Sequence, residues 1–282
     1  MKRNLLLAAA LVLSVGALAS CGDTTSSATS AETSVSTVTS EVVKVNGNAT
    51  EYGVVHTVNI TSVSIEVEND LTTSVKINET FTPSDWALVD ADEVAGQTID
   101  TITVTAEDHS GTPTDFTYAK FIEVDGDIYT GTAVAAEDVT NSQIVNYSNS
   151  DCEDLFAYIS ENAEWYFNVA EEGKLSIVAD AEGTVFGTPY TLGTVATYGT
   201  NFKADVDNTY WPVSDFALLG WKGNVAKIEA ALTGLDLSTA PEVAKGETTG
   251  TYTFAGVETG ATMAFTSTYV ALAVAAYATL VA

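Results

Sequence analysis

Residues 22–41 contain almost no large apolar residue and so cannot build a packed core, and residues 1–20 have the composition of an export signal, so we expect the fold in residues 44–282. Residues 1–4 carry two positive charges, residues 5–17 form an apolar run, and small residues follow up to Ser20. This order of charged, apolar and small-residue segments is typical of a secretory signal peptide. The apolar run is shorter than the ~20 residues of a membrane-spanning helix. We therefore predict that residues 1–20 are removed on export.

The signal ends at a cysteine. Leu18-Ala19-Ser20-Cys21 resembles the bacterial lipobox, whose cysteine is lipidated and becomes the first residue of the mature protein. Residues 22–41 are mostly Ser, Thr and Ala, a composition that favours a flexible linker. We expect residues 21–43 to tether an extracytoplasmic protein to a bacterial cell membrane. An ordinary signal peptide with a chance cysteine, or an N-terminal anchor, are the alternatives.

The charge of the chain is strongly negative. It has 10 Lys and Arg against 38 Asp and Glu, and cleavage after Ser20 would lower the net charge from −28 to −30, since Lys2 and Arg3 are lost. Such a field repels nucleic acid, so we exclude nucleic acid as a partner. Hydrophobic residues make up 46% of the chain, which is enough for a real core in one large domain or two small ones.

Residues 44–135 show the alternation of β-strands. Strands are predicted within 54–67, 72–77 and 98–104. The apolar residues change parity between Ile60 and Val63, which predicts a bulge near Thr61-Ser62. Residues 116–129 predict a hairpin, because Asp125-Gly126 stands between two apolar runs.

Helical spacing begins after residue 150. Ser150, with Glu153 three residues later, predicts a capping box, and Gly173 predicts the end of the helix. The predicted apolar stripe consists of Leu155, Phe156, Ile159, Ala163 and Tyr166. Further strands are expected at 175–178 and 251–254, and one or two helices, interrupted near Gly220 or Gly223, within 213–232.

The chain ends with an uncharged helix over about 262–282. Its polar residues, and the lack of flanking basic residues, favour a buried helix over a membrane span. The predicted fold class is therefore α+β, with antiparallel strands, a few packed helices and the last helix C-terminal. Residues 44–282 form one region or two divided near residue 150; the pattern leaves both open.

The common catalytic residue sets are missing from the sequence. It has two histidines, His56 and His109, and no metal-binding pair, P-loop or nucleophile elbow. A hydrolase is therefore disfavoured, although no feature selects or excludes a pair among the 38 acids as a glycosidase site. With Cys21 lipidated, Cys152 has no disulfide partner, and we expect it to be half-buried and inert.

One short motif points to chemistry. Thr259-Gly260-Ala261-Thr262 stands between a predicted strand and the last predicted helix. Gly260 and Ala261 allow close approach to the backbone, and a helix N-terminus favours an anion. The Thr262 hydroxyl at that point is a possible site of esterification. An ordinary turn and helix cap is the alternative interpretation.

This motif and the helix after it resemble the end of FMN-binding domains in bacterial extracytoplasmic flavoproteins. Residues 59–67, Glu164-Trp165-Tyr166-Phe167 and residues 221–225 resemble further segments of that family. The resemblance implies covalent FMN, joined by a phosphoester to Thr262 with Thr259, Gly260 and Ala261 as neighbours. It also implies a flavin transferase as maturation partner and an electron-carrying role in the cell envelope.

Two further points follow from the resemblance. The flavin ring needs an apolar wall, for which the aromatic candidates are Trp165, Trp211, Trp221 and Tyr198. The family often has an aspartate six residues before the modified threonine, where this chain has Gly256. The alternative function is therefore a cofactor-free surface binding or adhesion lipoprotein on the same fold. The sequence names no electron donor or acceptor.

Overall fold

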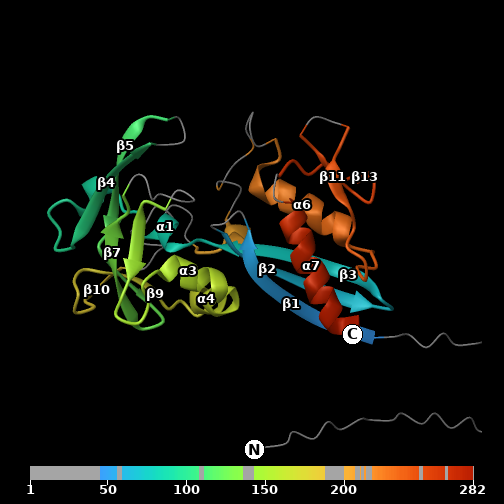
Figure 1. Cartoon of the computed structure of the whole chain (residues 1–282), viewed down its shortest axis with the longest axis horizontal. Coiled ribbons are helices and arrows are strands. Elements are labelled where there is room, and N and C mark those ends of the chain that lie inside the picture. Colours follow the sequence, from blue (N-terminus) through green and yellow to red (C-terminus); the bar gives the residue numbers. More distant parts are fainter. Residues whose placement is uncertain are drawn as a thin grey trace, which may run out of the picture. The chain divides into compact units, whose positions relative to one another are not determined.

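The computed structural model describes residues 45–55, 59–107, 111–135, 143–187, 200–206, 210, 213, 218–247, 250–263 and 266–281. The predicted signal peptide, Cys21 and the tether lie outside these residues, as do His56, His109, Tyr198 and Trp211. The fold is α+β, as predicted, with antiparallel sheets, packed helices and the last helix at the C-terminal end (Figure 1).

The strands form four groups. The first sheet has the order β1 (Val45–Val55), β2 (Asn59–Glu68), β3 (Leu71–Thr80). A ribbon pairs β4 (Thr101–Glu107) with β5 (Pro113–Ala119). A five-stranded sheet has the order β10 (Val185–Gly187), β9 (Leu175–Val178), β6 (Phe121–Val124), β7 (Asp127–Ala133), β8 (Val145–Ser148). A small sheet joins β11 (Val243–Lys245), β12 (Tyr252–Phe254) and β13 (Val257–Glu258).

The helices are short except for two. They are α1 (Pro83–Trp86), α2 (Ala91–Val94), α3 (Leu155–Glu161), α4 (Ala163–Glu171), the 3₁₀ helix η3 (Lys203–Asp205), α6 (Gly220–Leu232) and α7 (Thr266–Val281). Residues 42–282 group into one unit by their contacts, and the five-stranded sheet takes strands from both sides of residue 150.

Strand β2 contributes to two hydrophobic cores. Ile60 belongs to a core formed with α4 and the five-stranded sheet, whereas Val63 belongs to a core formed with α6 and α7. The β1–β2 register runs without a break from Gly47↔Val67 to Val55↔Asn59. The predicted bulge near Thr61-Ser62 is therefore wrong. Successive side chains of a strand point to opposite faces. The apolar residues of β2 change parity because Ile60 faces one core and Val63 faces the other.

The predicted hairpin is confirmed. Val124 pairs with Asp127 across the turn, and Asp125 and Gly126 have φ angles of 54° and 90°. Positive φ at both central residues is the geometry of a two-residue type I′ turn. The local sequence is sufficient here because the turn conformation depends on these two residues alone.

The predicted helix after residue 150 is present, but its cap is wrong. Helix α3 begins at Leu155, and Asp154 is the N-cap, whose side chain accepts from the Ala157 amide. Ser150 lies outside the helix. Asn162 separates α3 from α4 with a non-helical backbone, so one expected helix is two.

The two C-terminal helices cover the first sheet. Helix α7 contacts β1 and β2, and α6 contacts β3. Helix α6 begins at Gly220, which has φ 62°, and Gly223 lies within it. Helix α7 buries Tyr269, Ala273 and Tyr277, in agreement with the prediction of a packed helix. Among the described residues, no helix has the length and apolar character needed to span a membrane.

Candidate functional site

The predicted motif forms a closed loop between β13 and α7. The Thr259 hydroxyl donates to the Tyr252 carbonyl oxygen at 2.8 Å and accepts from the Ala261 amide at 3.1 Å. The Tyr252 amide donates to the Ala261 carbonyl oxygen at 2.9 Å, and Gly260 has φ 75°. A residue with a side chain would be strained at that φ, which explains the glycine. The loop is therefore pinned to β12 at both ends.

Thr262 is held by helix α6. Its amide and its hydroxyl both donate to Asn224 Oδ1, at 2.6 Å and 3.1 Å. Asn224 is fully buried, and its Nδ2 donates to the Gly220 carbonyl oxygen at 2.6 Å. Thr262 itself is half-buried. A buried amide thus orients a hydroxyl that remains partly accessible.

The expectation that Thr262 lies at the start of the last helix is wrong. Helix α7 begins at Thr266, four residues further on. The Ala261 amide is occupied by Thr259, so it is not free for an anion. Sequence periodicity does not separate the residues just before a helix from its first turn, because both can be equally apolar.

A lysine lies beside the motif. A Cβ placed on Gly260 would be 3.9 Å from Lys227 Cε, so the Lys227 side chain extends next to the loop from α6. Lys227 is exposed and forms no ion pair within the described part of the chain. Because no described carboxylate pairs with this ammonium group, it is available to a phosphate.

A second cluster of polar residues is buried beneath helices α6 and α7. Glu79 on β3 has no exposed surface. Its Oε2 accepts from Lys203 Nζ and from Trp221 Nε1, both at 3.0 Å. Its Oε1 accepts from the Tyr269 hydroxyl and, at 3.4 Å, from the Thr61 hydroxyl. The carboxylate therefore links β2, β3, η3, α6 and α7. We call the five residues that meet here the Glu79 cluster: Thr61, Glu79, Lys203, Trp221 and Tyr269.

Lys203 is equally buried. Its Nζ donates to Asn59 Oδ1 at 2.8 Å and lies 4.7 Å from the ring centre of Tyr210 and 5.5 Å from that of Phe81. Burial is the largest influence on the pKa of Lys203 and would lower it, but the charges of Glu79, Tyr210 and Asp85, with the hydrogen bond to Tyr210, together outweigh burial and raise that pKa above its ordinary value. Burial, and then Glu79, raise the pKa of Tyr269 as well. Lys203 therefore stays charged and Tyr269 neutral.

The sequence analysis did not identify this cluster. One signal was available, because Glu79 has the same parity as Val75 and Ile77 and so lies on the buried face of β3. A carboxylate on an apolar face needs a partner. Its partner Lys203 is 124 residues away, so the pair could not be found from spacing.

Helix α6 connects the two sites. Trp221 contacts Glu79, and Asn224, three residues later, contacts Thr262. Residues three apart lie on the same face of a helix. The position of Thr262 therefore depends on the contact between α6 and the Glu79 cluster.

The two aromatic candidates that the structure describes, Trp165 and Trp221, each donate a hydrogen bond to a carboxylate outside the motif. Trp221 is buried in the core, and its Nε1 is occupied by Glu79. Trp165 lies on α4, and its Nε1 donates to Asp125 Oδ2 at 3.2 Å. Tyr198 and Trp211 lie outside the described residues. Cys152 is half-buried, and burial raises the pKa of its thiol, which agrees with an unreactive cysteine.

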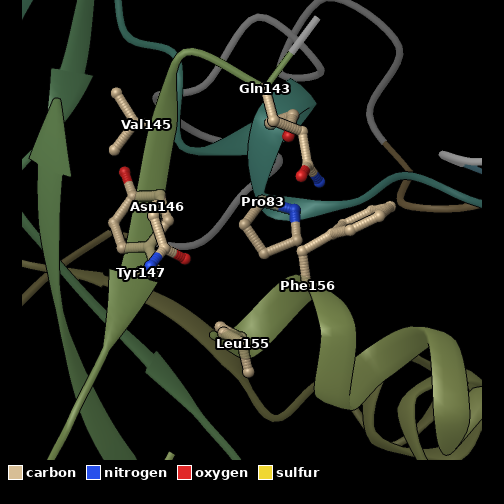
Figure 2. A pocket seen from close by; sticks show the side chains of 8 residues that line it. Pro83, Gln143, Val145, Asn146, Tyr147, Leu155 and Phe156 are labelled. Carbon is tan, nitrogen blue, oxygen red and sulfur yellow. The ribbon is translucent and has the colours of Figure 1, made fainter. Parts of the chain in front are cut away.

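Two pockets lie away from the motif. One, beside Pro83, Tyr147 and Phe156, has a volume of about 10 Å³, which is too small for more than a single water (Figure 2). The other is a larger groove beside β1. Within the described ranges, no group of three or more His, Cys, Asp or Glu side chains could hold a metal ion.

Comparison with protein-family models, with curated proteins and with solved structures finds no match to this chain.

Proposed function

We propose that this protein is a lipid-anchored flavoprotein of the bacterial cell envelope that carries FMN covalently on Thr262 and passes electrons. In the covalent step the Thr262 oxygen bonds to the phosphorus of an activated FMN donor. The hydroxyl loses its proton, and the donor's leaving group departs. A flavin transferase would supply the donor and catalyse the step.

The observation that carries this proposal is the contact between Thr262 and Asn224. Esterification would remove the hydroxyl donor from Asn224 Oδ1 but leave the Thr262 amide, which lies at 2.6 Å. The buried Asn224 oxygen therefore keeps a hydrogen bond in the modified protein, and the modification does not leave this buried acceptor without a donor. A threonine held only through its hydroxyl would lose its anchor on modification.

The surroundings suit a phosphate. Lys227 extends beside Gly260 and supplies a positive charge. The isoalloxazine ring would perform the redox chemistry, while the chain attaches and orients it. The strong negative charge of the protein disfavours the anionic reduced flavin and lowers its potential.

Co-expression with a flavin transferase tests the proposal. We expect residues 22–282 to gain the mass of one FMN less one water, with a yellow colour that survives denaturation. Thr262→Val should abolish the adduct, whereas Thr262→Ser should retain it. Thr268→Val, a half-buried threonine on α7, is the matched control and should be modified like the parent protein. A colourless, unmodified parent protein would refute the proposal.

The second candidate is a cofactor-free surface binding or adhesion lipoprotein. Gly256 favours it, because its φ of 81° is one at which an aspartate would be strained. The turn before the motif therefore differs from the one that the family resemblance implies. This alternative predicts a colourless protein even when an active transferase modifies a control substrate in the same cells.

A further inference from the structure

A groove runs beside the first sheet, away from the motif. It is lined by Thr50, Glu51, Tyr52 and Gly53 of β1 and by residues 160–165 at the junction of α3 and α4. Its volume is about 400 Å³, within the range of sites that bind small ligands or short peptide segments. We call it the β1 groove. It includes none of the four residues of the motif, so the inference drawn from it is independent of the proposed function.

One wall of the β1 groove is the edge of a sheet. Strand β1 has 11 residues and, in the described structure, pairs only with β2. Helices α7 and α4 both contact β1 (Figure 1). Tyr52 contacts Phe167 of α4 on one face, and Gly53 faces Leu272 of α7 on the other. The backbone groups on the open edge are a template for another strand.

The β1 groove is acidic. Glu51 lines it from β1, and Glu161 and Glu164 line it from the helix junction, whereas no lysine or arginine of the described segments does. Burial raises the pKa of the Tyr52 hydroxyl, and the charges of Glu164 and Glu171 raise it further. The potential in the groove therefore favours a cation.

Two aromatic side chains of the β1 groove are held in place. Tyr52 packs against Phe167 with ring centres 5.5 Å apart. Trp165 packs edge-on against Tyr158 at 5.2 Å, and its Nε1 donates to Asp125. Fixed aromatic faces beside carboxylates are suited to ammonium and guanidinium groups.

We propose that the β1 groove binds an extended peptide segment that carries lysine or arginine, which adds as a strand to the edge of β1. Backbone hydrogen bonds to β1 would align the segment, and every second side chain would point to the same side of it. Its cationic side chains on the face of Tyr52 and α4 would lie against Glu161 and Glu164. The open edge argues for a peptide, and the three carboxylates argue for a basic one.

The test uses residues 22–282, which retain the whole unit of residues 42–282, and a peptide with alternating valine and lysine. We expect saturable binding in calorimetry, and shifts of the backbone amide signals of residues 50–53. A peptide with glutamate in place of lysine, and one N-methylated at alternate residues, should both fail to bind. Equal binding of the N-methylated peptide would overturn strand addition, and binding of neutral oligosaccharides instead of peptide would overturn the ligand class.

Substitution of the carboxylates provides the second arm. Glu161→Gln with Glu164→Gln should weaken binding about three- to tenfold, since each exposed ion pair contributes a few-fold in affinity. The control is Glu68→Gln with Glu107→Gln, two exposed glutamates that do not line the β1 groove. An equal loss in both double variants would show that the net charge of the protein, and not the groove, attracts the peptide. Thr262→Val should bind the peptide normally.

Discussion

Lys203 Nζ lies 3.0 Å from Glu79 Oε2, and both side chains are fully buried. Residues separated by 124 positions thus form an ion pair inside the protein. The carboxylate has further donors from α6, α7 and β2, and the ammonium lies over two aromatic rings. Charges removed from water need this degree of compensation to remain ionised.

Removing one member of this pair should be strongly destabilising. Lys203→Met leaves the Glu79 carboxylate buried without its cation, and we expect the free energy of unfolding to fall by about 3 kcal/mol or more. Glu79→Gln should have a similar effect, and the double variant should lose less than the sum of the two. Urea unfolding measures each value.

A surface ion pair provides the control. Lys76 is 74% exposed and lies 3.6 Å from Glu229. Lys76→Met should change the free energy of unfolding by less than about 0.5 kcal/mol. Equal losses for Lys76→Met and Lys203→Met would contradict the assigned role of the buried pair.

The buried lysine also predicts the alkaline pH dependence of stability. The folded pKa of Lys203 lies above its unfolded value of 10.5, because Glu79, Tyr210 and Asp85 together outweigh the effect of burial. The stabilisation is therefore complete below about pH 10 and is lost as the pH rises above 10.5 towards the folded pKa. Unfolding measured from pH 8 to 11.5 should show this decline in the parent protein. A slope of the same size in Lys203→Met would assign it to other groups.

Asp154 caps helix α3, and Ser150 does not. Asp154 accepts a hydrogen bond from the Ala157 amide at 2.9 Å, whereas Ser150 lies outside the helix. Asp154→Ala should lower the free energy of unfolding by about 1 kcal/mol, the usual value of an N-cap. Ser150→Ala should leave it unchanged within error. Thermal or urea unfolding of the two variants decides between the observed cap and the capping box expected from the sequence.

Asn224 links stability to the proposed modification. Asn224→Ala removes the acceptor of the Thr262 amide and hydroxyl and leaves the Gly220 carbonyl oxygen without the Asn224 amide. We expect a loss of about 2 kcal/mol in unfolding free energy, together with slower flavin attachment although Thr262 is intact. Mass spectrometry during co-expression follows the attachment. Asn48→Ala, an exposed residue on β1, is the control and should affect neither quantity.

Part of this fold follows from short-range patterns. The hairpin at Asp125-Gly126, the apolar stripe that contains Leu155 and Ile159, and the helical stop at Gly173 each depend on residues close together in the chain. Turn conformation and helical spacing are local properties, so the sequence predicts them, and with them the α+β class.

The tertiary structure alone decided the rest. Ile60 and Val63 face separate cores, Asn224 holds Thr262, and Lys203 neutralises Glu79. Each of these relationships joins elements that are distant in the sequence or opposite faces of one strand. The alternation of apolar and polar residues along a strand indicates which side chains are buried. Which residue each of them contacts is set by the way the sheets and helices pack. The location of the motif was therefore predictable from the sequence, whereas the contact by which Asn224 of α6 holds Thr262 was visible only in the tertiary structure.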